Sequence, residues 1–418
     1  MRTFTLKGLF VTAIFMLLGC LAIHAADGDL ITKQITIKLE EAGTLPSKIG
    51  DTKKYKITNL KIMGEINGTD LRFIREMAGC DYKGKGTEGK LATLDLSEAK
   101  IVKGGDYYYN YYGCYTLDDV IGNQAFDGCS SLTSLTLPSS VTSIGSSAFS
   151  GCSGLTSLTL PSSVTSIEWS AFSGCSGLTS LTLPSSVTSI GGSAFSGCSG
   201  LTSLTLPSSV TSIGGSAFSG CSGLTSLTLP SSVTSIGGSA FSGCSGLTSL
   251  TLPSSVTSIG GSAFSGCSGL TSLTLPSSVT SIGESAFRGC SSLASLTLPS
   301  SVTSIGKSAF SGCSGLTSIY VSWESPLSID ASTFKDANTE KCILYVPNGT
   351  YDDYWISNWG IFENIVEYDA TGINHITTSG DAKEISRYAV DGQRLEVPAK
   401  GLNIVKYSDG SVKKVVVQ

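Results

Sequence analysis

The sequence predicts a mainly β solenoid, a coil of short and nearly identical turns. Cysteine recurs every 23 residues from Cys129 to Cys313, and phenylalanine keeps the same interval from Phe126 to Phe310. Within each unit, leucines alternate with serine and threonine, which is the period-two pattern of a strand with one buried face. A fixed period of this length is typical of arrays in which each unit buries its apolar face against its neighbours. We therefore expect an extended surface rather than a pocket.

Each repeat is expected to contain two extended pieces and a turn, as residues 132–154 illustrate. Leu135 and Leu137 alternate with polar residues, and Pro138 ends the strand because proline cannot donate to a strand ladder. A single turn of α- or 3₁₀-helix is then expected near the end of the unit. The residues after the proline are a second apolar pair and the turn, namely Val141 and Ile144, then Ala148, Phe149 and Cys152.

The repeat pattern Leu-x-x-Leu-x-Leu-Pro-x-x-Val-x-x-Ile-Gly-x-x-Ala-Phe-x-x-Cys resembles the 23-residue leucine-rich repeat of the BspA-like bacterial surface proteins, also called the Treponema pallidum type. The resemblance covers residues 117–336. It implies a curved, right-handed leucine-rich-repeat solenoid with the Leu-Thr-Ser-Leu-Thr-Leu strands on its concave side. It also implies a non-enzymatic protein that adheres to host matrix proteins, host cells or other bacteria.

Residues 1–26 have the pattern of a signal peptide, with Arg2 and Lys7 before a short apolar run and small residues up to Ala26. The apolar run is too short to span a membrane. Cys20 lies in a Leu-Leu-Gly-Cys sequence that resembles a lipobox, so lipidation of Cys20 is the alternative to ordinary cleavage near Ala25. Either route predicts an exported protein, at the cell surface or outer membrane or outside the cell.

Residues 27–116 are predicted to form an N-terminal cap and a degenerate first repeat with a tyrosine-rich insertion. The degenerate repeat starts with the leucines of residues 91–96. A short helix is expected over residues 70–77, with Asp70 as its N-cap. The 23-residue register then breaks at residues 104–114, where the insertion lies.

Residues 337–369 are predicted to form a C-terminal cap, and residues 370–418 a linker and a small β domain. The cap resembles the closing cap of the same family, with an apolar plug over the last coil. In the β domain, Asp391-Gly392 and Asp409-Gly410 are typical of hairpin turns. This domain resembles the C-terminal sorting domains of type IX secretion substrates, which implies attachment to the outer membrane. The expected plug residues are Trp355, Trp359, Phe362 and Ile365.

The thirteen cysteines do not predict a disulfide framework. Stacked strands would place equivalent cysteines ~4.8 Å apart with parallel side chains, which does not suit the Cβ spacing of a disulfide. We expect a buried column of thiols that acts as a small apolar filler. Cys80, Cys114 and Cys342 lie outside this register, and the sequence leaves open whether Cys80 pairs with Cys114.

The sequence predicts no catalytic residue, cofactor or metal site. Of its two histidines, His24 lies in the signal peptide and His375 stands alone in the linker. The acid pairs Asp118-Asp119 and Asp352-Asp353 are adjacent residues, whose side chains tend to diverge, so we interpret them as solvated loop residues. The formal net charge of −5 disfavours nucleic acid, which needs basic surface to release counterions.

Three features are candidates for ligand binding: the tyrosine-rich insertion, a lone tryptophan and a threonine column on the strands. Tyrosine supplies large contact area at low entropic cost. The alternatives without a binding role are that the tyrosine rings pack over the first coil and that the tryptophan arose by neutral sequence drift. The candidate residues are Tyr107, Tyr108, Tyr109, Tyr111, Tyr112, Trp169, Thr159, Thr182, Thr205, Thr228 and Thr251.

The predicted function is adhesion to host extracellular matrix or cell-surface proteins, or to glycans, through the solenoid face and the insertion. Weak contacts repeated along the array would act together, so that avidity replaces affinity. One alternative is a structural stalk with no ligand of its own. Another is a glycan-binding accessory protein of a polysaccharide-uptake system.

Overall fold

The computed structural model describes residues 29–109, 113–369, 384–389, 394–395, 397–398, 400–407 and 412–417. The predicted signal peptide with Cys20, the residues Tyr111 and Tyr112, and His375 lie outside the described residues.

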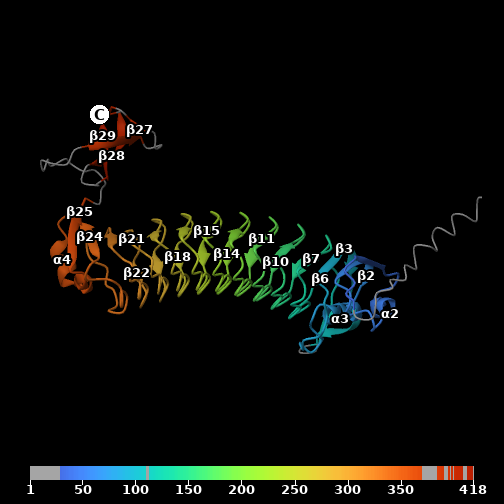
Figure 1. Cartoon of the computed structure of the whole chain (residues 1–418). Coiled ribbons are helices and arrows are strands. Elements are labelled where there is room, and N and C mark those ends of the chain that lie inside the picture. The colour runs from blue at the N-terminus through green and yellow to red at the C-terminus, as the bar shows by residue number, and fades with distance from the viewer. Residues whose placement is uncertain are drawn as a thin grey trace, which may run out of the picture.

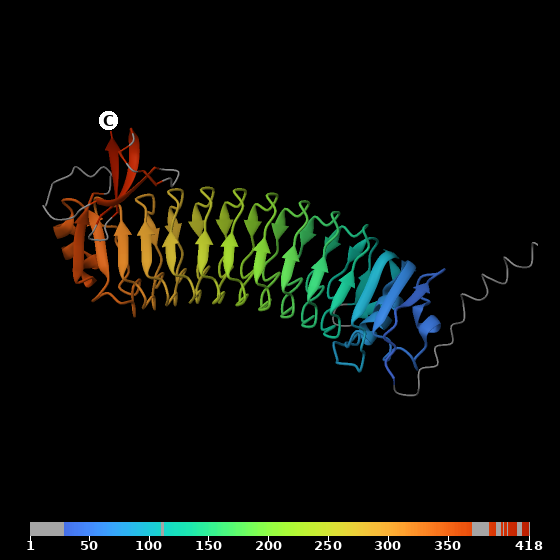
Figure 2. The same cartoon turned by 45° about the horizontal axis from the view of Figure 1, so that its top comes forward.

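The repeats form a curved coil with parallel strands stacked along two of its sides (Figures 1 and 2). This confirms the predicted mainly β solenoid. Equivalent residues of successive repeats pair in register, as Leu181 does with Leu204. The first sheet contains β7 (Ser134–Thr136), β9 (Ser157–Thr159), β11 (Ser180–Thr182), β13 (Ser203–Thr205), β15 (Ser226–Thr228) and β17 (Ser249–Thr251), and β19 (Ser272–Thr274), β21 (Ser295–Leu298) and β23 (Ser318–Val321) begin the sheet that follows it.

The second sheet comes from the second apolar pair of each repeat, so both extended pieces predicted for the unit are present. Its strands have two residues each and also pair in register, as Ile190 does with Ile213. The strands are β6 (Val120–Ile121), β8 (Ser143–Ile144), β10 (Ser166–Ile167), β12 (Ser189–Ile190), β14 (Ser212–Ile213), β16 (Ser235–Ile236), β18 (Ser258–Ile259), β20 (Ser281–Ile282) and β22 (Ser304–Ile305).

Stacked phenylalanines and a thiol ladder fill the coil beneath the turns. Phe172 and Phe195 stack with ring centroids 5.2 Å apart and planes 2° from parallel. The thiol of Cys152 donates to the carbonyl oxygen of Phe126 at 3.1 Å, and the later repeats repeat this contact. The cysteine column is therefore a hydrogen-bonded ladder as well as an apolar filler. Every described cysteine is a free thiol, so Cys80 does not pair with Cys114.

Hydrogen-bonded turns replace the expected helical turn at the end of each repeat. Ala148 N–H donates to Gly145 O at 3.2 Å, and the same spacing recurs from Cys152 to Phe149. The chain cannot continue as a helix because Ser147 has φ +55° and Gly151 has φ +68°, both in the left-handed region. Instead, the N–H of Phe149 donates across to the next repeat, to Ala171 O at 2.7 Å.

The N-terminal cap packs two short helices against the first strands of the solenoid. Its elements are β1 (Ile35–Lys38), α2 (Leu45–Ile49), β2 (Asn59–Ile66), α3 (Gly68–Met77) and β3 (Thr93–Ile101). The expectation that Asp70 is the N-cap is wrong, because α3 begins earlier, with Asn67 as the N-cap and Asp70 as the N3 residue that completes the capping box. The buried Asp70 carboxylate instead accepts the N–H groups of Asn67, Gly43 and Leu45 at 2.6–3.0 Å.

The C-terminal cap consists of β24 (Ile343–Pro347), α4 (Tyr351–Ile356), the 3₁₀-helix η1 (Asn358–Ile361) and β25 (Asn364–Tyr368). Trp359 and Phe362 are fully buried and Ile365 is partly buried against the core, as expected of the plug. Trp355 is not part of it, since its side chain is 51% exposed. Tyr354 is buried in its place and donates its hydroxyl to Trp323 O at 2.9 Å.

The C-terminal residues form an antiparallel sheet of the order β27-β26-β28-β29. Its strands are β26 (Glu384–Ala389), β27 (Arg394–Leu395), β28 (Gly401–Tyr407) and β29 (Val412–Val417). Tyr388 pairs with Arg394 and Lys406 with Val412, so β26 and β27, and β28 and β29, are antiparallel neighbours. The predicted turn residues Asp391, Gly392, Asp409 and Gly410 lie outside the described residues.

Candidate binding surface

The polar side of the first sheet is an uncharged grid of hydroxyl groups, which we call the hydroxyl face. On β9, Ser157 and Thr159 are exposed while the Leu158 between them is buried. The period of two therefore turns every hydroxyl outward. Parallel register places Thr182 beside Thr205, so equivalent residues form straight columns. The hydroxyl face consists of Ser157, Ser180, Ser203, Ser226, Ser249, Thr159, Thr182, Thr205, Thr228 and Thr251.

The hydroxyl groups of this face are free, whereas those of neighbouring columns are used by the backbone. Thr156 donates to Thr133 O at 3.1 Å, and Ser301 donates to Val279 O at 2.8 Å. These bonds recur along both flanking columns and tie each repeat to the one before it. Within the described part of the chain, no side chain of the hydroxyl face makes a hydrogen bond. Each one therefore has a donor and two acceptor positions available to a ligand.

A shallow hollow opens on this face between β13 and β15. Serine and threonine hydroxyls rim it, and Leu204, Leu206 and Pro230 add apolar surface. Between these two strands only Thr205 and Thr228 are registered as partners, so the ladder is less regular here than between β11 and β13. The structure thus brings the predicted threonine column together as one surface.

Trp169 is 62% exposed but does not belong to the hydroxyl face. It lies in the turn after β10, and its indole covers the backbone of the next repeat. A methyl group on Gly192 would lie 2.8 Å from the indole Cδ1. The residue that follows Trp169 by one repeat must therefore be small, which explains how a single bulky side chain is accommodated among glycines.

The tyrosine-rich insertion is a hairpin of β4 (Gly104–Tyr109) and β5 (Cys114–Thr116). Tyr108 is a correction to the predicted ligand set, because its side chain is 1% exposed and its hydroxyl donates to Asn123 O at 2.9 Å. Tyr109 is half-buried and donates to Asp127 Oδ2 at 3.1 Å. Burial, together with the Asp127 carboxylate, raises the pKa of Tyr109 to about 12. Both rings therefore anchor the hairpin.

Tyr107 is half-buried, like Tyr109, but its hydroxyl makes no hydrogen bond within the described part of the chain. Its ring lies 5.8 Å from that of Tyr82 and 6.3 Å from that of Tyr115. The guanidinium of Arg72 lies against the Tyr82 ring at 3.6 Å. Sequence reasoning missed Arg72 and Tyr82, because nothing in the spacing of a lone arginine and a lone tyrosine indicates that they meet.

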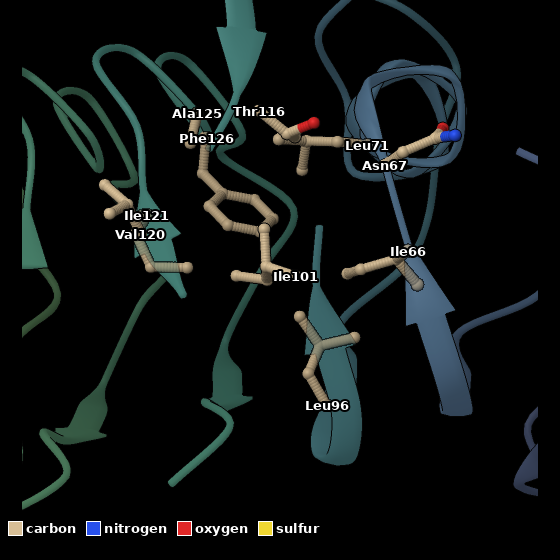
Figure 3. A pocket seen from close by; sticks show the side chains of 10 residues that line it. All are labelled: Ile66, Asn67, Leu71, Leu96, Ile101, Thr116, Val120, Ile121, Ala125 and Phe126. Carbon is tan, nitrogen blue, oxygen red and sulfur yellow. The ribbon is translucent and has the colours of Figure 1, made fainter. Parts of the chain in front are cut away.

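An internal cavity separates α3 from the first repeat (Figure 3). Its walls are largely apolar, with Leu71 and Ile66 on the cap side and Phe126 and Ile121 on the repeat side. Its volume is about 10 Å³, close to the minimum for one water molecule. The cavity is too small for an organic ligand.

The described residues contain no group of three or more histidine, cysteine or acidic side chains that could hold a metal ion. The same residues include no helix that is long and apolar enough to cross a membrane.

The family model described as the BspA-type leucine-rich repeat region matches residues 119–248 and 234–352, which together are more than half of the 418-residue chain. The chain belongs to this family. A search of curated proteins found no relative of this BspA-type protein.

Several solved bacterial structures are similar to the chain. A leucine-rich repeat protein from Bacteroides ovatus is 26% identical, with 62% of this chain and 90% of that one covered and a TM-score of 0.38. The leucine-rich repeat protein of T. pallidum is 38% identical over 36% of this chain and 71% of its own, with a TM-score of 0.35. A leucine-rich cell surface protein from Faecalibacterium prausnitzii is 28% identical, with 69% and 87% covered and a TM-score of 0.36.

Proposed function

We propose that this BspA-type protein is an exported, non-enzymatic binding protein that adheres through its hydroxyl face. Its targets are proteins of the host matrix or cell surface, or glycans. The observation that carries the proposal is the contrast between neighbouring hydroxyl columns. The hydroxyls of Thr156 and Ser301 are used to join repeats, whereas those of Ser157 and Thr159 make no bond within the described protein.

The geometry favours repeated weak contacts over one tight site. Each repeat offers the same two free hydroxyls at the same position, as the register of Thr159, Thr182 and Thr205 requires. A ligand with a regular array of polar groups can contact several repeats at once, so its affinity rises steeply with the number of repeats that it spans. The predicted signal peptide and C-terminal β domain support export and attachment to the cell surface.

Repeat number supplies the test of this proposal. The protein of residues 27–418 and a version that lacks residues 198–243, which are two whole repeats, would be applied to arrays of host matrix proteins and polysaccharides. We expect a ligand whose apparent affinity falls by about tenfold or more on deletion, because avidity depends on valency. A folded protein that binds nothing on either array would contradict adhesion and support the stalk.

A further inference from the structure

Arg72 is presented at the surface of the N-terminal cap between two tyrosine rings. It lies on α3, with its guanidinium carbon 3.6 Å from the ring centroid of Tyr82 and 5.5 Å from that of Tyr107. Cation–π contacts of this kind hold the planar guanidinium in one orientation. Arg72 therefore has less conformational freedom to lose on binding than an ordinary surface arginine.

The donors of this guanidinium are not used within the described part of the protein, where Arg72 has neither a salt bridge nor a hydrogen bond. Arg75, one turn along α3, shows the opposite behaviour. Its guanidinium is buried and donates to the carbonyl oxygens of Gln124, Ala125 and Asp127 at 2.7–3.1 Å. Arg75 thus closes the N-terminal end of the solenoid, while Arg72 is half-buried against the rings of Tyr82 and Tyr107.

The loop of residues 81–85 adds the positive charge of Lys83 beside these rings. Lys83 makes no ion pair with Asp81, the carboxylate of the same loop. Lys83 Nζ lies 5.4 Å from the centroid of the Tyr82 ring. Asp81 uses its Oδ1 to accept the backbone N–H groups of Lys83 and Lys85, each at 2.8 Å. The Asp127 carboxylate accepts the hydroxyl of Tyr109. The charges beside the rings of Tyr82 and Tyr107 therefore include the cations of Arg72 and Lys83, together with the exposed carboxylate of Asp106 next to Tyr107.

Apolar surface continues from these rings along β5. Tyr115 is 56% exposed and meets Tyr107 edge to face, with the ring planes at 85°. Leu117, two residues further on, is 58% exposed. Arginine and tyrosine are among the residue types that most often dominate binding energy at protein interfaces.

We propose that Arg72, Tyr82, Lys83, Tyr107 and Tyr115 form a docking surface for an acidic segment of a partner protein. An Asp or Glu carboxylate would accept two N–H groups of Arg72, since the planar guanidinium fork matches a carboxylate. An adjacent apolar side chain would pack against Tyr115. The apolar surface beside the cations favours a peptide over a sulfated polysaccharide, which carries charge along its whole length. This surface is separate from the hydroxyl face.

The test uses residues 27–418 and immobilised peptides that combine Asp or Glu with Leu or Phe. Matched peptides carry Asn or Gln instead of the acids. We expect binding to the acidic peptides, with a loss of about tenfold or more in Arg72→Gln. Arg72→Lys should lose most of that affinity as well, because lysine keeps the charge but not the planar fork. Lys48→Gln removes one exposed charge elsewhere in the same cap and should change affinity less than about twofold.

Tyrosine variants separate binding from folding. Tyr82→Phe keeps the ring and should retain affinity, whereas Tyr82→Ser should lose it, with thermal unfolding measured for each variant. Equal binding of the acidic and the amide peptides would overturn the proposal. So would full affinity in a folded Arg72→Gln protein, or a preference for sulfated polysaccharide over every peptide. Substitutions on the hydroxyl face should leave peptide binding unchanged, which distinguishes failure here from failure of the adhesion proposal.

Discussion

The cysteine of each repeat combines burial with a specific hydrogen bond. Its thiol donates to a phenylalanine carbonyl of the preceding repeat, as Cys198 does to Phe172 O at 3.2 Å. Desolvation raises the pKa of Cys198 and of Cys244 from 9.0 to about 12. The reactive species of cysteine is the thiolate, so these thiols are inert in the folded protein. A protein with a cysteine in each of these repeats thereby avoids disulfide exchange.

We predict that unfolding becomes easier in alkaline solution. Because the folded state favours the protonated thiol, this contribution to stability is complete below the unfolded pKa and is lost as pH rises from about 9 towards 12. Urea denaturation across that range measures the free energy of unfolding. Cys198→Ala should show a shallower fall, since it removes one such thiol. A fall of the same slope in wild type and Cys198→Ala would contradict this assignment.

At the scale of the element, neighbouring glycines of one turn have different roles. A methyl group on Gly237 would lie 2.8 Å from backbone atoms of Gly214 and Gly215 in the preceding repeat. A methyl group on Gly238 would meet nothing nearer than Gly261 O at 3.3 Å. The glycine at the first position lets adjacent repeats approach without a local shift, and Glu168 is the residue that replaces it in one repeat. The second position is compatible with larger residues.

This contrast gives a matched pair of variants. Gly237→Ala should destabilise the protein by about 1–3 kcal/mol, because two repeats must move apart. Gly238→Ala should cost less than about 1 kcal/mol. Denaturant unfolding of the two variants beside the wild type measures both values. Equal destabilisation by the two would show that the close approach at Gly237 is not what limits the turn.

The sequence predicted the repeated elements well because their pattern is local. Apolar and polar residues alternate around Leu135, and Val141 and Ile144 form a second apolar pair. These short patterns indicate the two strands of the repeat even when the rest of the chain is ignored.

The helix start was misplaced because Asn67 and Asp70 share one capping box, in which Asn67 is the N-cap and Asp70 lies at N3. The additional bonds of the Asp70 carboxylate to N–H groups 25 and 27 residues away are not visible in a local pattern. Similarly, no local pattern shows that Tyr108 points inward, since that depends on how the hairpin docks on the first coil.

The candidate surface was predictable only in part, for the same reason. Periodicity placed Thr159 and its equivalents in one column on an exposed face. It could not show that the hydroxyl of Thr156 is bonded to the preceding repeat while that of Thr159 is free, because both are threonines in the same strand region.

At the scale of the whole molecule, stability and binding both depend on repetition. No single 23-residue unit buries enough apolar surface to balance the entropy of ordering its chain, so neighbours and caps share the core. The caps continue this buried aromatic core beyond the phenylalanine stack of the repeats, with Trp359 at one end and Tyr108 at the other. The repeats between them present the same free hydroxyls many times.

The most direct test of adhesion through the hydroxyl face compares two triple variants on the ligand arrays. The first variant replaces three threonines of that face with valine, and so removes three free hydroxyls, at Thr182, Thr205 and Thr228. The second variant makes the same change beside the second sheet of the same repeats, where it removes three exposed hydroxyls, at Thr188, Thr211 and Thr234. We predict that the first variant loses binding by about tenfold or more, since its contacts act together, and that the second binds like the wild type. Equal binding by both folded variants would contradict the central claim.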